Sequence, residues 1–176
     1  MRRDTLIRER TTPVDQSQAS LPSFTGLQVH YDEQFNFSLL IPVNWQRLDL
    51  EHSPGDFYVP DPVEPATGFA VEGRDLGTEV KPGDLAAVRR GFLQGLRELP
   101  DCKIDSSEAE AIGPLITLEA RHTFRDGSTI RKRWARLLYQ GRTQVRLIAQ
   151  GATVERFDYW EPMFFSTMRT VRFGRY

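Results

Sequence analysis

Alternating apolar and polar positions run through much of the chain and predict β-strands. Phe35, Phe37, Leu39 and Ile41 recur at a spacing of two, so one face of this strand is expected to be buried. Pro42 should end the strand, because proline has no N–H to donate to a sheet. Similar patterns predict further strands at residues 27–31, 45–50, 57–59, 68–74, 103–111, 115–124, 129–140, 144–152 and 171–173.

A helical spacing replaces this alternation between residues 85 and 99. Apolar residues fall there at steps of three and four, which places them on one stripe of a helix: Leu85, Val88, Phe92, Leu96 and Leu99. Asp84 is expected to be the N-cap, because its carboxylate can accept from the free amides of the first turn. Pro100 should stop the helix.

A second helix is predicted at residues 159–169. Asp158 and Glu161 have the spacing of a capping box, and Pro162 then falls in the first turn, where its missing N–H costs little. The buried stripe of this helix is expected to be Phe157, Trp160, Phe164 and Met168. Across the whole chain, the large side chains predicted to be buried are Trp45, Phe92, Leu96, Trp160 and Phe164.

The order of the elements is strands, a helix, more strands and a helix. Asp126-Gly127 lies between two long predicted strands and is typical of a tight hairpin turn. This order favours an α+β fold, an α/β/α sandwich with a central antiparallel β-sheet. Residues 1–26 are polar and lack periodicity, so we expect a flexible N-terminal tail followed by a single domain at residues 27–176.

Two stretches of the chain resemble the PsbP-like superfamily. Residues 31–45, YDEQFNFSLLIPVNW, resemble the opening of these domains, with an aromatic strand followed by a proline and a tryptophan at the turn. The ending is similar too: Gln150-Gly151-Ala152 precedes an aromatic helix through Tyr159-Trp160, and residues 170–173 complete the pattern. The resemblance covers residues 27–173.

The resemblance implies an α/β/α sandwich around an antiparallel sheet and a role in binding or assembly. The superfamily includes PsbP itself, a Ran-binding import factor, the DcrB-type lipoproteins and the Eag chaperones. Its characterised members are mostly binding or assembly proteins, and it has no shared catalytic residues to carry over to this chain. The chain lacks the lipobox cysteine of the DcrB type, since its one cysteine, Cys102, is internal.

The net charge of −1 hides an uneven distribution. Residues 1–26 carry four basic and three acidic groups, a net of +1. Residues 27–118 carry seven basic and sixteen acidic groups, a net of −9, and residues 119–176 carry twelve basic and five acidic groups, a net of +7. Such asymmetry can mark an anionic partner. The simpler interpretation, which we favour, is that the two halves neutralise each other within one fold.

Candidate chemistry is sparse. The three histidines, His30, His52 and His122, have no mutual spacing that would build a metal site, and none lies at metal-ligand spacing from the cysteine. There is no G-x-S-x-G and no glycine-rich nucleotide loop. Glu108 and Glu110 share one face of a predicted strand, where a solvated face is the expected role. We therefore predict no catalytic, cofactor-binding or metal-binding residues and no enzymatic activity.

Basic residues concentrate on the predicted strands between residues 115 and 152. The possible anion- or partner-binding residues are Arg121, Arg131, Lys132, Arg133, Trp134 and Arg146. Three of these arginines have the same parity and Trp134 lies among them, and arginine beside an aromatic ring suits contact with phosphate or a base. However, residues 131–133 are consecutive and must point to both faces of a strand. Ion pairing with the acidic half is the alternative.

These observations predict a non-enzymatic domain that binds, assembles or chaperones another protein and needs no cofactor. The alternative is binding of nucleic acid or an acidic membrane surface through the basic hairpin at residues 121–146. The N-terminus has no apolar run like that of a secretory signal. No stretch approaches the ~20 apolar residues that span a bilayer. A cytoplasmic location is therefore expected, and the sequence leaves the oligomeric state open.

Overall fold

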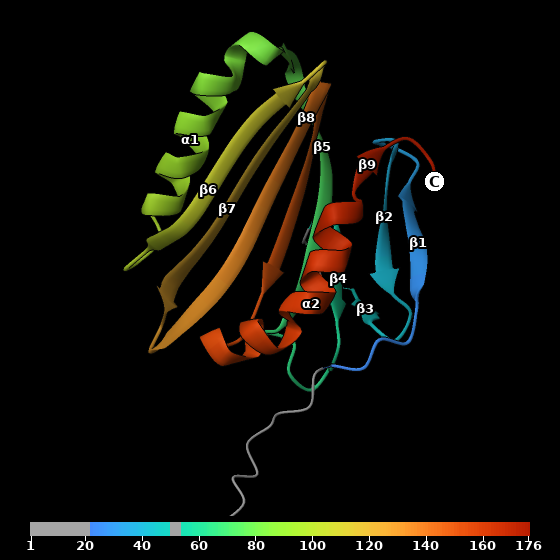
Figure 1. Ribbon diagram of the computed structural model, residues 1–176, viewed down its shortest axis with the longest axis vertical. Coiled ribbons are helices and arrows are strands. Elements are labelled where there is room, and N and C mark those ends of the chain that lie inside the picture. Colours follow the sequence, from blue (N-terminus) through green and yellow to red (C-terminus); the bar gives the residue numbers. More distant parts are fainter. Residues whose placement is uncertain (1–21, 50–53) are drawn as a thin grey trace, which may run out of the picture.

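The computed structural model describes residues 22–49 and 54–176, which form two antiparallel sheets and two α-helices (Figure 1). The larger sheet has six strands in the order β3-β4-β5-β8-β7-β6. Their bounds are β3 Gln46–Leu48, β4 Asp56–Val59, β5 Gly68–Val80, β6 Lys103–Ile112, β7 Leu115–Asp126 and β8 Thr129–Gln150. The predicted α+β fold with a central antiparallel sheet is confirmed.

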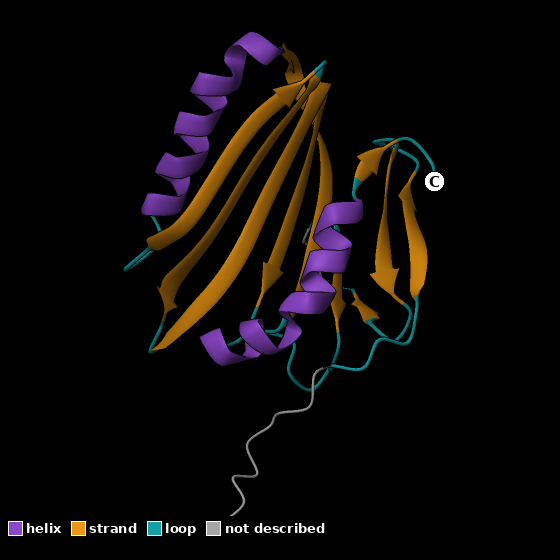
Figure 2. Ribbon diagram, in the orientation of Figure 1, coloured by secondary structure: helices purple, strands orange, loops and turns teal. Residues whose placement is uncertain are grey.

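The two helices, α1 (Leu85–Arg97) and α2 (Val154–Thr170), cover opposite faces of the six-stranded sheet. Consecutive residues of a strand point to opposite faces. Thus Leu138 packs into the core that includes α2, whereas its neighbour Leu137 packs into the core that includes α1. Figure 2 shows the strands lying between the two helices. We call these surfaces the α2 face and the α1 face.

A smaller sheet lies beside α2 and consists of β1 (Leu27–Asp32), β2 (Phe37–Pro42) and β9 (Arg172–Phe173). Two hydrogen bonds join the end of the chain to β2. Ser38 Oγ donates to the Gly174 carbonyl at 2.6 Å, and the Leu40 amide donates to Thr170 Oγ1 at 3.0 Å. The last residue of α2 and the segment that follows it therefore hold β2 in place.

The main apolar core lies under α2. Phe157, Phe164 and Met168 of this helix are fully buried, as is the alternate set on β2 that the period of two predicts. Burying each large apolar side chain stabilises the fold by roughly 1.5–3 kcal/mol. The strands supply the other side of this core: Phe69, Val71, Trp134, Leu138, Val145, Leu147 and Ala149.

A smaller core lies under α1. The buried strand residues there are Ile116, Leu118, Leu137 and Tyr139, and Leu85, Val88 and Phe92 of α1 pack on them. The helix rests mainly on β6 and β7 rather than on the middle of the sheet. As a result, α1 leaves part of this face open beside β5 and β8.

The second helix begins earlier than the sequence predicts. It starts at Val154, and its N-cap is Thr153, whose side chain accepts from the Arg156 amide at 3.3 Å. The predicted capping box of Asp158 and Glu161 is therefore wrong, and Pro162 lies in the interior of the helix. An interior proline cannot donate to the carbonyl four residues before it and bends the helix, and α2 changes direction along its length in Figure 1.

Other boundaries and burials also differ from prediction. The range of β8 contains both predicted strands, 129–140 and 144–152, which fold back on each other near Gly141, as the bond from the Gly151 amide to the Lys132 carbonyl at 3.1 Å shows. β5 runs six residues past the predicted end at position 74. Asp84 does precede α1, but its carboxylate accepts from the Lys81 amide in a short turn instead of capping the helix. Phe92 and Trp160 are only partly buried, whereas the predicted burial of Trp45, Leu96 and Phe164 is confirmed. Residues 1–21 of the tail predicted at 1–26, and the predicted strand end near position 50, lie outside the described residues.

One glycine allows the turn between β1 and β2 to pack against the main sheet. The ring of Phe35 packs directly over Gly73 of β5, on the α2 face. A Cβ at position 73 would lie 2.3 Å from Phe35 Cδ2 and 2.8 Å from Phe35 Cβ, which is well inside van der Waals contact. The absence of a side chain at this position is therefore what lets the aromatic ring approach the strand.

Candidate functional site

The six predicted binding residues fall on two different faces of the sheet. The hairpin register pairs Arg121 with Trp134, so odd positions of β7 share a face with even positions of β8 up to residue 140. Beyond the turn at Gly141 the parity is reversed, because odd positions 145, 147 and 149 pack into the α2-face core. The α2 face therefore receives Arg121, Lys132 and Trp134. The α1 face receives Arg131, Arg133 and Arg146. The shared parity of Arg121, Arg131 and Arg133 does not give a shared face, and the hairpin does not present one basic surface.

The residues on the α2 face have structural partners. Arg121 lies 4.4 Å from the centre of the Trp134 ring and 2.8 Å from the Glu161 carboxylate. Lys132 lies 2.6 Å from the Asp158 carboxylate. Trp134 itself is 0% exposed, so its ring belongs to the core and cannot stack on a base or a ligand. This half of the predicted set serves to hold α2 on the sheet.

Ion pairs neutralise most of the basic C-terminal third. Ten of the twelve basic residues in 119–176 lie within 4.0 Å of a carboxylate. Five of them reach acidic residues of the segment 27–118: Arg125, Arg142, Arg146, Arg156 and Arg175. This pattern supports the interpretation that the two halves neutralise each other. Exposed pairs of this kind stabilise by only about 0–1 kcal/mol each, so their effect is mainly on local charge.

Arg133 is different, because no carboxylate of the described residues lies within 4.0 Å of it. Its Nε donates to Gln150 Oε1 at 3.0 Å, its Nη2 donates to the same oxygen, and its guanidinium lies 4.4 Å from the centre of the Phe124 ring. Burial, and next the nearby charge of Arg131, lower the pKa of Arg133 to about 10. The side chain is still cationic at neutral pH, so a half-buried positive charge lies on the α1 face with only neutral hydrogen-bond partners.

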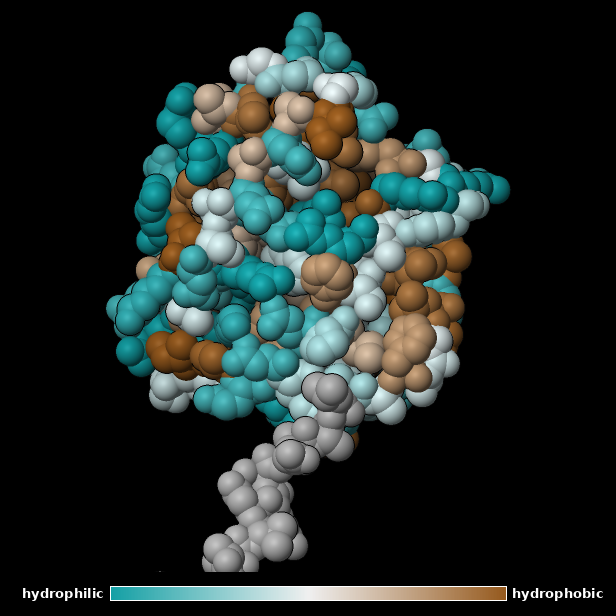
Figure 3. Space-filling view, viewed as in Figure 1, coloured by the Kyte–Doolittle hydropathy of each residue, from teal (hydrophilic) through white to brown (hydrophobic). Residues whose placement is uncertain are grey.

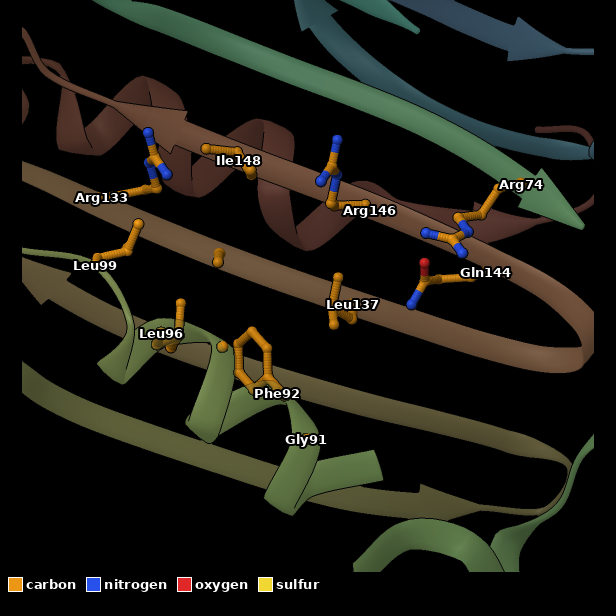
Figure 4. Close-up of a pocket in the computed structure, with 12 residues that line it drawn as sticks. Arg74, Gly91, Phe92, Leu96, Leu99, Arg133, Leu137, Gln144, Arg146 and Ile148 are labelled. Atoms are coloured by element: carbon orange, nitrogen blue, oxygen red, sulfur yellow. The ribbon is translucent and has the colours of Figure 1, made fainter. Parts of the chain in front are cut away.

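A groove of about 510 Å³ lies next to Arg133, between α1 and the strands β5 and β8 (Figure 4). Its apolar lining comes from both sides: Phe92, Leu96 and Leu99 on or just after α1, and Ala135, Leu137 and Ile148 on β8. Its polar lining is Arg74, Arg133, Gln144 and Arg146. In Figure 4, Arg133 lies near Leu99 at one end, and Arg74 lies near Gln144 at the other. We call this site the α1 groove.

The sequence did not point to most of this site. Arg74 and Gln144 end and begin two predicted strands, and no sequence pattern groups them, because the groove depends on which residues β5 and β8 place opposite each other. One signal was present in the sequence. Gly91 and Gly95 are one helical turn apart beside the apolar stripe of α1, and both line the groove. Glycine is an unfavourable residue in the middle of a helix.

A polar cluster between the two sheets has the residue types of a catalytic site but not its environment. His30 Nδ1 and the Tyr58 hydroxyl are hydrogen-bonded at 2.9 Å, and His30 Nε2 lies 3.6 Å from the Asp56 carboxylate. Burial raises the pKa of Tyr58 to about 12, so this hydroxyl stays protonated. Burial also lowers the pKa of His30. The cluster therefore links β1 to β4 through the His30–Tyr58 hydrogen bond and the approach of His30 to Asp56.

The remaining candidates add no reactive group. The register confirms that Glu108 and Glu110 share a face, and both are exposed beside the Glu119 carboxylate, to which Arg136 and Arg169 are paired. Burial raises the pKa of the Cys102 thiol. Within the described residues, no three His, Cys, Asp or Glu side chains are grouped as metal ligands would be, and His52 lies outside those residues.

Two further observations concern the surface. Viewed as in Figure 3, a hydrophobic patch lies over β1 and β2, and the exposed apolar side chains near these strands are Phe24, Val29 and Val43. These side chains carry no charge and so favour no particular ligand chemistry. In the described part of the chain, no helix is long and apolar enough to cross a membrane.

Comparison with solved structures identifies the fold. No protein-family model matches the chain, and no curated protein matches it in sequence. Similar structures are nevertheless known. Cyanobacterial PsbP (CyanoP) of Synechocystis has a TM-score of 0.59 at 14% identity over 88% of this chain and 98% of its own. LpqN of Mycobacterium tuberculosis, described as involved in cell envelope biogenesis, has a TM-score of 0.59 at 12% identity over 85% of this chain and 91% of its own.

A third similar structure comes from a eukaryote. The Ran-binding protein Mog1p of Saccharomyces cerevisiae has a TM-score of 0.53 at 10% identity and covers 88% of this chain and 96% of its own. Together these structures confirm that the chain has the PsbP-like fold that its sequence resembles. At such low identity they show the fold alone.

Proposed function

We propose that this chain is a protein-binding accessory domain rather than an enzyme, and that the α1 groove is where its protein partner docks. The observation that supports this most strongly is the combination of apolar and cationic side chains that line the groove. Apolar surface from α1 and β8 lies directly beside Arg133, whose charge no carboxylate of the described residues neutralises within 4.0 Å. Buried aromatic or apolar anchors combined with arginine are typical of the centre of a protein–protein interface.

The fold supports a binding role by analogy. Mog1p is by its own description a Ran-binding protein, and it has the same fold as this chain. The analogy concerns the class of function and does not transfer Ran as a partner. The lack of activated nucleophiles in the His30 cluster points in the same direction, since Tyr58 is held protonated.

Binding of a polyanion to the basic hairpin is less well supported. A strand of nucleic acid needs cations along one continuous surface. Here the hairpin cations point to both faces of the sheet, and most of them already pair with carboxylates. The α1 groove is a more specific candidate than the hairpin as a whole.

Affinity capture with two matched tryptophan variants tests the proposal. Gly95→Trp would fill the groove, because a Cβ at this position meets nothing within 4 Å. Gln94→Trp adds the same bulk to the exposed outer side of α1, away from the groove. Wild type and both variants are used as full-length bait in an extract of the source cells at several salt concentrations.

The expected result is a stoichiometric protein that wild type and Gln94→Trp retain and Gly95→Trp loses. Equal retention by all three baits would move the docking site away from the groove. Recovery of no protein partner at any salt concentration, together with substrate turnover in a broad activity screen, would reverse the proposal in favour of an enzyme.

A further inference from the structure

Arg133 has N–H donors that its hydrogen bonds to Gln150 do not use. A guanidinium has five N–H donors, and the two bonds to Gln150 Oε1 use two of them. Gln150 is itself held in place, because its Nε2 donates to the Ala66 carbonyl at 3.1 Å. The amide therefore orients the guanidinium without neutralising it. An added carboxylate would find a pre-oriented cation, which is the arrangement that gives strong charge-assisted hydrogen bonds.

The α1 groove continues from this cation as apolar surface and ends at a second cationic group. Figure 4 shows Leu137 lying between Arg133 at one end and Arg74 at the other. Arg146 also lines the groove, but it pairs with Glu72. Arg74 has no carboxylate of the described residues within 4.0 Å and is exposed. The two unpaired arginines thus lie at opposite ends of the groove, with apolar surface and the paired Arg146 between them.

Gly91 and Gly95 add an independent observation. A Cβ built at either position meets nothing within 4 Å, so nothing in the described structure requires glycine there. Each glycine nevertheless costs the helix roughly 0.8–1 kcal/mol relative to alanine. A helix surface without side chains beside the groove would allow the backbone of a bound chain to approach closely. This would explain why glycine occupies both positions.

We infer, on the basis of the proposed function, that the α1 groove takes an acidic amphipathic segment of the partner protein. A carboxylate of the segment pairs with Arg133, and its apolar side chains rest on Ala135, Leu137 and Ile148. A second acidic residue, at the other end of the segment, faces Arg74. Sequence specificity then comes from the spacing between acidic and apolar residues.

Other occupants fit less well. Nucleic acid would place a phosphate at each step along the groove, whereas between the two unpaired arginines lie apolar side chains and Arg146, which is already paired with Glu72. Small-molecule sites usually bury 70–90% or more of the ligand, whereas this site is an open groove. The chain's own residues 1–21 carry four basic and three acidic groups, so their net charge of +1 does not complement the groove.

Peptide selection tests the inference directly. A random 12-residue phage library is selected on the full-length chain, and the enriched sequences are synthesised with a fluorescein label for anisotropy titrations. We expect them to combine Asp or Glu with Leu, Ile, Phe or Met. Arg133→Gln should weaken their binding at least ~10-fold, since truncating one partner of a desolvated charge pair removes a charge-assisted hydrogen bond. Arg133→Lys should restore part of the affinity, because lysine keeps the positive charge but lacks the planar guanidinium that binds a carboxylate with two hydrogen bonds.

Three controls separate binding from stability. Arg131→Gln removes an arginine on the same face that is already paired with Asp126, and should change affinity less than ~2-fold. Arg74→Gln affects an exposed side chain that the fold does not need and should weaken binding several-fold. Replacing the key acid of the peptide by its amide should weaken binding to wild type but not to Arg133→Gln, as expected when the two groups interact.

The outcomes distinguish this inference from the proposed function. Neutral peptides that are lost with Gly95→Trp but unaffected by Arg133→Gln would overturn the acidic-segment inference and leave the docking site standing. Peptides unaffected by both variants would overturn both. A library that yields no enriched sequence, or single-stranded DNA or phosphatidylglycerol vesicles that bind more tightly than the peptides and depend on Arg133, would also overturn the inference.

Discussion

The two faces of the six-stranded sheet come from the same strands but differ in how they are covered. On the α2 face, Trp134 and its neighbours are sealed by a helix, and the cations there are paired across to α2. On the α1 face, α1 rests mainly on β6 and β7, and a groove with arginines remains beside it. Alternation along one strand can therefore place a stability core and a binding surface back to back.

The largest expected effect comes from truncating one phenylalanine on each face. Phe164→Ala should lower the free energy of unfolding by about 3–5 kcal/mol, because a fully buried ring leaves a cavity in the α2-face core. Phe92→Ala should cost roughly 1–2 kcal/mol, since Phe92 is only partly buried at the groove. Urea titrations measure both. Equal losses would mean that the α1 face is as closed as the other.

A pH titration sharpens the comparison next. His122 is fully buried on the α1 face, and neither ring nitrogen has a hydrogen-bond partner among residues 22–49 and 54–176. Burial, followed by the charge of Arg133, lowers its pKa to about 4. Because the folded pKa lies below the unfolded value of 6.5, the unfolded state binds a proton at His122 more readily than the folded state does. The free energy of unfolding is therefore unaffected by this group above pH 6.5 and decreases as the pH falls towards 4.

The loss attributable to His122 should approach about 3 kcal/mol at most. His122→Leu removes the titrating ring and should therefore be less sensitive to acid than wild type over this range. Urea titrations at pH 7, 5.5 and 4 give the difference between the two proteins, in which the titration of the carboxylates cancels. Parallel stability curves would show that the ring is hydrated rather than sealed.

Adding one methyl group to the α2 face should have a smaller effect. Gly73→Ala places a Cβ against the ring of Phe35, so we expect a loss of about 1–3 kcal/mol from overpacking. In a Phe35→Ala background the same change should cost much less, because the clashing ring is gone. Thermal and urea unfolding of the four proteins of this cycle measure the coupling. If Gly73→Ala lowers the free energy of unfolding as much in the Phe35→Ala background as in wild type, the loss does not come from contact with Phe35.

The same chemical change on the α1 face should have the opposite sign. Gly91→Ala and Gly95→Ala meet open space and improve helix propensity, so each should raise the free energy of unfolding by about 0.5–1 kcal/mol. If the glycines serve docking, the stabilised variants should bind the selected peptides more weakly than wild type. Destabilisation of the kind expected for Gly73→Ala would show that the α1 face is also tightly packed.

Most of the fold could be predicted from local patterns. The alternation on β2, the stripe on α1 and the Asp126-Gly127 turn each depend on neighbouring residues, and each is confirmed. The start of α2 could not be predicted in this way. Asp158, Glu161 and Pro162 form a convincing local start signal, but tertiary packing of Phe157 extends the helix back to Thr153.

The candidate site was less predictable, for a physical reason. Which basic residues share a face depends on the pairing register of β7 with β8, and that register reverses the grouping suggested by parity. The groove further depends on where α1 rests on the sheet, which its apolar stripe does not specify. Arg74 and Arg133 come together with α1 only in the folded chain, so spacing alone could not group them.

An amide NMR titration of the uniformly labelled full-length chain with a selected acidic peptide tests the central claim most directly. We predict shift changes concentrated at residues 91–99, 133–137 and 144–148, which line the α1 groove, and their loss in Arg133→Gln. Changes centred instead on the exposed Phe165 of α2, or on Val29 and Val43 beside the small sheet, would contradict the assignment of the α1 face as the binding surface.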